Sequence, residues 1–201
     1  TLFFNLCAYG NPIMKKHLLL ALSLAAATLT PSIARADSVH VGYDTTTIGG
    51  VSLSGLSASG SLDLTENISL ELSTGSVDTT VSGLKVSLSS TAVGVGYNTA
   101  LSDTVDLKLV VASVSQALTA SWGGYTDSAD GSSTAYGALL KAEITGGVDG
   151  MAGFSKSTEA GSKINTMFGI SVGVSDTMDL TLSMSNNSVV KNTSIGVRYN
   201  F

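Results

Sequence analysis

The closing stretch of the chain, 193–201, constrains the fold more than any other segment. Its apolar residues recur at every second position, and successive side chains of an extended strand point to opposite faces. One face would carry Thr193, Ile195, Val197, Tyr199 and Phe201, and the other Ser194, Gly196, Arg198 and Asn200. Soluble sandwiches also contain such two-faced strands, so the alternation predicts a strand without choosing its surroundings.

The composition from residue 37 onward favours the same kind of structure. Ser, Thr, Val, Leu and Gly prevail there, and both prolines of the chain, Pro12 and Pro31, lie before it. Nothing in 37–201 therefore interrupts a β ladder. No apolar run in this region is long enough for a spanning helix. If the chain enters a membrane, it must do so as a closed barrel, the other structure that pairs every backbone group in lipid.

The beginning of the chain has the pattern of an export signal. Met14 opens a short basic segment, an apolar run covers 18–29, and Ala34 and Ala36 form an A-x-A cleavage site. We expect 14–36 to be a signal peptide that is removed after Ala36.

Two further boundaries follow. Residues 1–13, which contain the single cysteine Cys7, are expected to be an upstream extension outside the fold, and 37–201 a single domain. Three of the 10 basic residues precede residue 37 and all 15 acidic residues, Asp37 included, lie in 37–201, which leaves 7 against 15 and a formal charge of −8. This charge opposes nucleic-acid binding. Without cysteine the domain has no disulfide or thiolate metal site, and we expect no cofactor.

A short motif occurs three times and marks turns. It reads apolar, Ser/Thr, acidic, Asn/Thr, apolar, polar, Leu, and occurs at 64–72, 101–109 and 174–182. Ser, Thr, Asp and Asn bond to nearby backbone groups and favour tight reversals. The motif therefore predicts hairpins, each turn leading into an alternating strand.

With those turns at one end, the domain divides into ten strands, or eight if 38–50 is irregular. The expected strands are 38–45, 51–63, 67–76, 82–98, 104–117, 133–145, 148–157, 164–174, 178–188 and 192–201. The opposite end would receive the connections 46–50, 77–81, 118–132, 158–163 and 189–191. The polar, Gly-rich 118–132 is expected to be the longest loop.

In three of these strands the apolar residues change from one face of the strand to the other, which we call a phase change. The changes occur near Gly55, between Ser89 and Ala92, and at the adjacent pair Val110-Val111. Either β-bulges restore the phase or the strand boundaries are misplaced.

The last residues carry a family resemblance. Ser194, Gly196, Tyr199 and the terminal Phe201 follow the order polar, any, Gly, two of any, aromatic, any, aromatic. This ending resembles the closing-strand signal of bacterial outer-membrane β-barrels, and the turns resemble those of the OmpA/OmpX-like families. The resemblance implies an all-β, antiparallel transmembrane barrel in the bacterial outer membrane. It also implies recognition of the ending by the barrel-assembly machinery and contact with outer-membrane lipid and lipopolysaccharide. A monomer is favoured.

The two faces of the expected strands differ as a membrane barrel requires. The lipid-facing set is Ile68, Leu70, Leu72, Val93, Val95, Tyr97, Val105, Leu107, Leu109, Tyr136, Ala138, Leu140, Ala142, Ile144, Phe168, Ile170, Val172, Val174, Leu180, Leu182, Met184, Ile195, Val197, Tyr199 and Phe201. None is charged, as the cost of charge on a lipid face demands. A lumen charge network is expected from Asp63, Glu71, Lys85, Asp106, Lys108, Lys141, Glu143, Asp179 and Arg198.

These charges are better explained as interior ion pairs, such as Asp106/Lys108 and Lys141/Glu143, than as catalytic groups. The one histidine of the domain, His40, is expected to be a hydrogen-bonded lumen residue. No catalytic site is expected. Lysines at 156, 163 and 191 either meet lipopolysaccharide phosphates or are ordinary solvated charges.

Three functions remain open on this sequence. The first is a non-enzymatic outer-membrane protein that stabilises the envelope or presents loops to partners. The second is a narrow porin-like channel for small solutes. The third is a soluble or surface-attached β-rich secreted adhesin.

Overall fold

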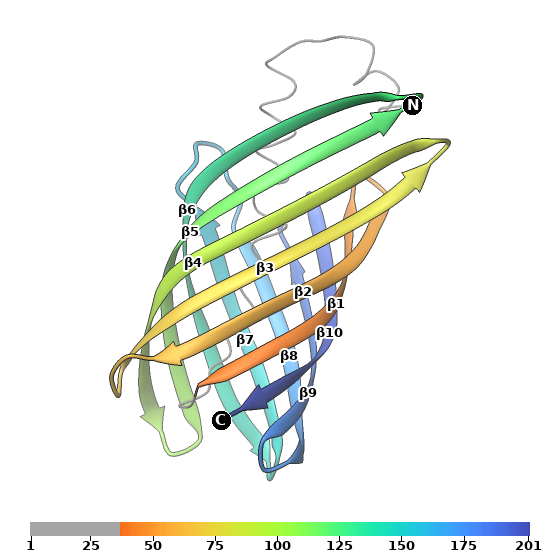
Figure 1. Ribbon diagram of the computed structural model, residues 1–201. Coiled ribbons are helices and arrows are strands. Elements are labelled where there is room, and N and C mark those ends of the chain that lie inside the picture. Colours follow the sequence, from red (N-terminus) through yellow and green to blue (C-terminus); the bar gives the residue numbers. More distant parts are fainter. Residues whose placement is uncertain (1–36) are drawn as a thin grey trace.

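The computed structural model describes residues 37–201, which form one closed antiparallel barrel (Figure 1). Its strands are β1 (Ser38–Ile48), β2 (Val51–Asp63), β3 (Ile68–Val81), β4 (Leu84–Ser102), β5 (Val105–Trp122), β6 (Tyr125–Thr145), β7 (Val148–Ser157), β8 (Asn165–Ser175), β9 (Met178–Asn186) and β10 (Val190–Asn200). Each strand pairs with its neighbours in sequence, and β1 pairs with β10 from Ser38↔Asn200 to Ile48↔Val190. The expected ten-stranded barrel is confirmed. The expected extension and signal peptide, with Ala34 and Ala36, lie outside the described residues.

One end of the barrel, which we call the turn end, holds the turns of the repeated motif together with Asp37 and Phe201. At each turn the equivalent Ser or Thr accepts a hydrogen bond from the backbone N–H two residues later. The pairs are Thr65 with Asn67 at 3.3 Å, Ser102 with Thr104 at 3.4 Å and Ser175 with Thr177 at 3.4 Å. The local bonding expected from the motif is confirmed. The Phe201 N–H donates to the Asp37 carbonyl at 3.0 Å, which joins the two ends of the described chain.

The opposite end, which we call the tip end, departs from the expectation. The segment 118–132 is not a loop: β5 continues to Trp122 and β6 begins at Tyr125, with register pairs from Trp122↔Tyr125 down the whole hairpin. Only Gly123 and Gly124 turn the chain, at φ of 55° and 85°. Left-handed conformations at both central positions suit the twist of a hairpin. Gly49-Gly50 and Ser82-Gly83 close the two preceding hairpins in the same way, so the expected loops 46–50 and 77–81 are mostly strand as well.

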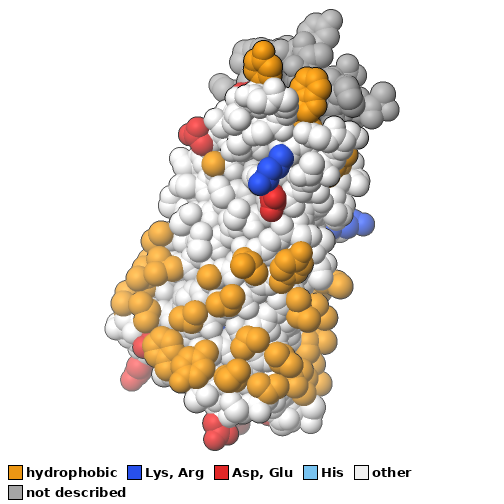
Figure 2. All heavy atoms as spheres, turned by 45° about the vertical axis from the view of Figure 1, so that its right-hand side comes forward, with side chains coloured by type: hydrophobic (Ala, Val, Ile, Leu, Met, Phe, Trp, Pro, Cys, Tyr) orange, Lys and Arg blue, Asp and Glu red, His pale blue; other side chains and the backbone are white. Residues whose placement is uncertain are grey.

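The outer surface near the turn end is an apolar belt. The predicted lipid-facing side chains all point outward, among them Val95 at 52% exposed and Ile195 at 62%. Figure 2 shows these apolar side chains gathered over the lower part of the barrel, whereas the upper part is mostly free of them in this view. Val39, Val41, Tyr43, Leu56 and Leu62 of β1 and β2 also lie on this outer face.

The long strands β3–β6 extend beyond this belt and form what we call the tip sheet, residues 74–91 of β3–β4 and 113–134 of β5–β6. β4, β5 and β6 have 19, 18 and 21 residues, against 9 to 11 for β7–β10. The hairpins rise along one side of the barrel in Figure 1. On the outer face of the tip sheet hydroxyl side chains replace the apolar ones: Thr74, Ser76, Thr80, Ser87, Ser89, Thr91, Ser113, Ser115, Thr119, Ser121, Ser128, Ser132 and Thr134.

This replacement explains the phase changes in the sequence. The pairings of β2, β3 and β4 contain no register shift near Gly55 or Ser89, so no bulge causes the phase changes. Both positions lie inside continuous strands, so a strand boundary does not cause the phase changes either. Along β4, Val86 and Leu88 point inward and are buried, whereas Val93 and Val95 point outward. Within the belt the apolar side chains of β4 face outward toward lipid. Beyond the belt the outer face is polar, and the apolar side chains point into the barrel interior instead.

Candidate functional site: the barrel interior

The interior near the turn end holds a buried ion pair between Glu71 of β3 and Lys108 of β5. Lys108 is fully buried, and its Nζ contacts Glu71 Oε1. The same oxygen accepts hydrogen bonds from Ser61 at 2.8 Å and Ser69 at 2.7 Å. The two charged side chains meet across β4 because Gly96 leaves the space: a Cβ there would lie 2.8 Å from Lys108 Cε. The hydrogen bonds offset the cost of removing both charges from water.

A second pair joins Arg198 of β10 to Asp179 of β9. Arg198 Nε and Nη2 lie 2.8 and 2.7 Å from Asp179 Oδ2. Arg198 Nη2 also donates to Ser171 at 3.0 Å, and Asn200 Nδ2 donates to the same carboxylate at 3.0 Å. This group fixes the closing strand to β8 and β9 from inside the barrel.

Lys141 of β6 forms a third pair, with Asp149 of β7 at 2.9 Å. Asp149 was not among the lumen residues expected from the sequence. It follows Val148 in the same strand, and because neighbouring side chains of a strand point to opposite faces, an outward Val148 would have placed Asp149 on the inner face. Lys108 and Lys141 each contact a carboxylate on another strand, whereas the sequence suggested same-strand partners. Asp106 lies opposite Lys141 in the β5–β6 register, and Glu143 opposite Asp149. Asp63 is exposed at the turn-end rim.

Lys85 does not belong to the lumen. It lies on the outer face of β4 near the tip end, with its side chain 59% exposed, and its Nζ is 3.5 Å from Asp78 Oδ2. The expectation was wrong because the face of β4 was assigned without the side change that Val86 and Leu88 reveal.

The interior near the tip end is apolar. Ile48, Leu53, Val77, Val86, Leu88 and Val190 form a buried cluster, which we call the tip cluster. Val51, Leu84 and Leu118 pack against it. A second apolar group, Ala92, Val110, Ala112, Val114 and Ala135, lies within the β4–β6 part of the wall. Neither apolar group was expected from the sequence, although the phase changes in the strands were the available signal.

His40 lies on the inner wall beside Ser194 and Gly196 of the closing motif. His40 is 5% exposed, and its Nε2 is 2.8 Å from Thr181 Oγ1. Gly196 faces Gly42 across the β1–β10 pairing, and a Cβ on Gly196 would overlap His40 and the Val41 carbonyl. Of the other motif residues, Ser194 points inward, whereas Tyr199 and Phe201 stack outside with ring centroids 6.1 Å apart.

The closed ladder, the uncharged outer belt and the paired interior charges define a transmembrane β-barrel, the class to which bacterial outer-membrane proteins belong. No protein-family model and no curated protein sequence matches the chain.

Solved barrels of this class resemble it in shape. Ail, the attachment invasion locus protein of Yersinia pestis, aligns over 83% of this chain and 97% of its own at 14% identity, with a TM-score of 0.44. The KdgM porin aligns over 81% and 99% at 8% identity, with a TM-score of 0.48. The β-barrel domain of Pseudomonas aeruginosa OprF aligns over 82% and 97% at 17% identity, with a TM-score of 0.43. At these identities the similarity concerns shape alone.

Proposed function

We propose that this chain is a non-enzymatic outer-membrane protein that binds partners outside the cell through its tip sheet. The observation that carries the proposal is an open strand edge. β7 pairs with β6 only between Ala135 and Thr145, and among the described strands β5 alone pairs with residues 125–134. The Thr134 carbonyl at the lower end of this edge accepts hydrogen bonds from Thr158, at 2.8 Å from its N–H and 3.2 Å from its Oγ1. The open part of the edge is therefore 128–133, where a further strand could pair, a common way for proteins to bind extended peptides.

The side chains at the edge support the same role. Residues 125–128 are exposed on both faces of β6, and so are 130–132. Trp122 and Tyr125, at 62% and 81% exposed, face each other at the hairpin tip. Large aromatic residues of this kind supply much of the energy at binding interfaces. Asp127 and Asp130 add negative charge along the strand, which favours a cationic partner over self-association.

The tip cluster opposes the channel alternative. Its apolar side chains occupy the interior at the end where solutes would enter, and a hydrophobic constriction resists wetting. Planar bilayers containing the folded protein should therefore show no conductance steps at any applied voltage. Regular steps of one size would favour the porin-like function instead.

The binding role is tested by shortening the tip hairpin, which removes Leu118 from beside the tip cluster but leaves the strand pairing of the apolar belt unchanged. Deleting 118–121 together with 126–129 removes four register pairs, keeps the face of every remaining residue and retains the Gly123-Gly124 turn. Cells that express this variant at wild-type level should lose adhesion to protein-coated surfaces. A matched control is Lys85→Met, which alters the neighbouring hairpin and leaves the edge intact. Unchanged adhesion together with unchanged envelope resistance would count against the proposal.

A further inference from the structure

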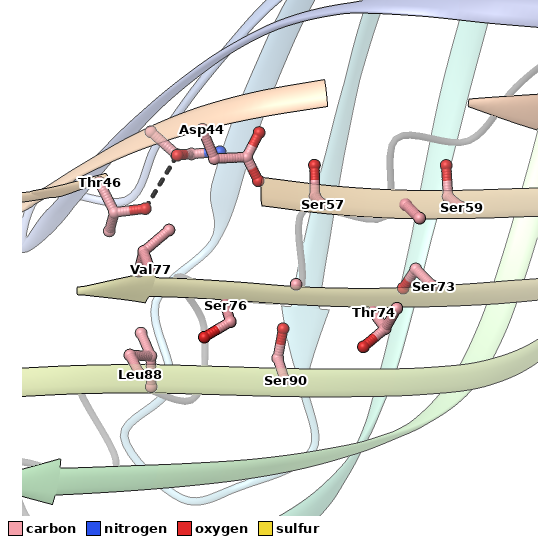
Figure 3. Close-up of a pocket in the computed structure, with 13 residues that line it drawn as sticks. Asp44, Thr46, Ser57, Ser59, Ser73, Thr74, Ser76, Val77, Leu88 and Ser90 are labelled. Carbon is pink, nitrogen blue, oxygen red and sulfur yellow. Dashed lines mark hydrogen bonds between the residues drawn. The ribbon is translucent and has the colours of Figure 1, made fainter. Parts of the chain in front are cut away.

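A second polar site lies inside the barrel wall, between the paired charges and the tip cluster. It is a cavity of about 30 Å³ whose lining includes Asp44 and Thr46 of β1, Ser57 of β2, Ser90 of β4 and Asn192 of β10. Figure 3 shows these side chains, apart from the unlabelled Asn192, around the cavity with Ser73 of β3 beside them. About 10–15 Å³ of such space is enough for one water molecule, so the cavity can hold a water molecule or a small ion.

Asp44 is the only acidic residue among those that line the cavity. Its side chain is 93% buried, since 7% is exposed, and its Oδ1 has no hydrogen-bond partner among the described residues. Ser194, its register partner on β10, likewise has a buried Oγ without a partner. An ionised carboxylate in such a place is costly unless a counter-charge accompanies it.

The described cationic side chains of the lumen contact other carboxylates. Lys108 contacts Glu71, Arg198 contacts Asp179, and Lys141 contacts Asp149. His40 lies on the same strand and face as Asp44, but its Nε2 bonds Thr181 of β9. Among the described residues, therefore, none of these side chains forms an ion pair with Asp44, and a cation from solution can supply its counter-charge.

The other polar atoms at the cavity are hard oxygen ligands. Thr46 Oγ1 donates to Asn192 Oδ1 at 2.9 Å, which directs the oxygens of both side chains to the cavity wall. Ser57, Ser73 and Ser90 add hydroxyls from three neighbouring strands. One carboxylate with neutral oxygens suits a monovalent cation, whereas Ca²⁺ takes 6–8 oxygens, usually with several carboxylates. Within 37–201, no three His, Cys, Asp or Glu side chains lie close enough together to hold a metal ion among themselves.

We propose that this cavity binds a single Na⁺ ion, held by the Asp44 carboxylate and the oxygens of Thr46, Asn192 and the lining serines. The ion neutralises Asp44 and joins β1, β2, β4 and β10 close to the seam where the barrel closes. The site is independent of the tip sheet and does not rest on the proposed function.

The test uses the full chain folded in detergent and follows the temperature at which the compact gel band converts to the unfolded one. Wild-type protein should convert at a higher temperature in NaCl than in choline chloride of equal ionic strength, with a saturable dependence on Na⁺. Asp44→Asn should convert at the same temperature in both salts. Asp63→Asn, which removes a carboxylate exposed at the rim, should retain the full Na⁺ response.

Two outcomes would overturn the site. If wild-type protein behaves alike in both salts, Na⁺ does not bind; an infrared band of a protonated carboxyl that Asp44→Asn removes would then show a proton in its place. An equal response in Asp44→Asn would mean that Na⁺ acts elsewhere. Should Asp44→Asn fail to fold, Ser57→Ala is the second variant, and it should raise the Na⁺ concentration at half-effect several-fold. No change in that concentration would then contradict the site.

Discussion

At the scale of single residues, the paired charges of the interior are the strongest candidates for stabilising the barrel. Lys108 is fully buried and depends on Glu71, whereas Lys85 and Asp78 form a pair that is 59% and 52% exposed. Removing one member of a buried pair leaves an uncompensated charge, which costs about 3–5 kcal/mol. An exposed pair contributes less than about 1 kcal/mol.

These magnitudes give the first prediction. Glu71→Gln should lower the free energy of unfolding in urea by about 3–5 kcal/mol, and the double variant Glu71→Gln/Lys108→Met should recover part of the loss. Lys85→Met is the control and should change it by less than about 1 kcal/mol. A small effect of Glu71→Gln, similar to that of the control, would show that the buried pair is not required.

Gly196 illustrates a steric requirement within the closing motif. A Cβ at this position would overlap His40 and the Val41 carbonyl, whereas a Cβ on Gly131 of the tip sheet meets nothing within 4 Å. Gly196→Ala should therefore destabilise the folded barrel by about 1–3 kcal/mol, the usual range for overpacking. Gly131→Ala should leave stability unchanged. The two variants are compared by urea unfolding in detergent, and equal midpoints would contradict the packing seen around His40.

At the scale of elements, β4 passes from lipid to the exterior within one strand. Val95 and Ser89 both point outward from it, one in the apolar belt and the other in the tip sheet. An arginine on a lipid face costs about 2–4 kcal/mol near the bilayer midplane and little outside the bilayer. Val95→Arg should thus reduce the folded fraction in lipid vesicles strongly, and Ser89→Arg should not. Similar losses in both variants would show that the belt ends elsewhere.

The closing strand β10 carries a prediction about assembly. If Tyr199 and Phe201 are recognised as the family resemblance implies, Phe201→Ser should leave export intact and lower the amount of assembled barrel. Phe168→Ser is a close control because Phe168 is 63% exposed and Phe201 62%, both on the outer face. The measurement is the ratio of assembled to exported protein in cells. A ratio that falls equally in both variants would point to lost apolar surface and not to a recognition signal.

The elements also show how far the sequence could be read. Period-two alternation and the turn motif predicted the belt and ten strands, with eight left open, because both signals depend on neighbouring residues. The length of the tip hairpins was missed: Ser, Thr and Gly in 118–132 are typical of loops, and only pairing with a partner strand makes them a sheet. Interior ion pairs were expected, but the partners of the lysines were missed for a similar reason, since Glu71 and Lys108 meet across a third strand whose Gly96 leaves them room.

At the scale of the whole molecule, the barrel has two parts with opposite polarity. Near the turn end it is apolar outside and charged inside, as lipid requires; at the tip end the tip cluster fills the interior and hydroxyls cover the outer face. The exterior part therefore has the construction of a soluble β protein, built as a continuation of the membrane strands. The membrane strands themselves therefore form the surface outside the membrane, and no separate domain is needed for it.

The most direct test of this account is outer-membrane fractionation combined with heat-modifiable migration on gels. The exported chain should be recovered in the outer-membrane fraction, as a compact band that shifts on boiling because the closed ladder resists detergent until heated. Recovery in the periplasm or the medium, or a band that does not shift on boiling, would contradict a transmembrane barrel.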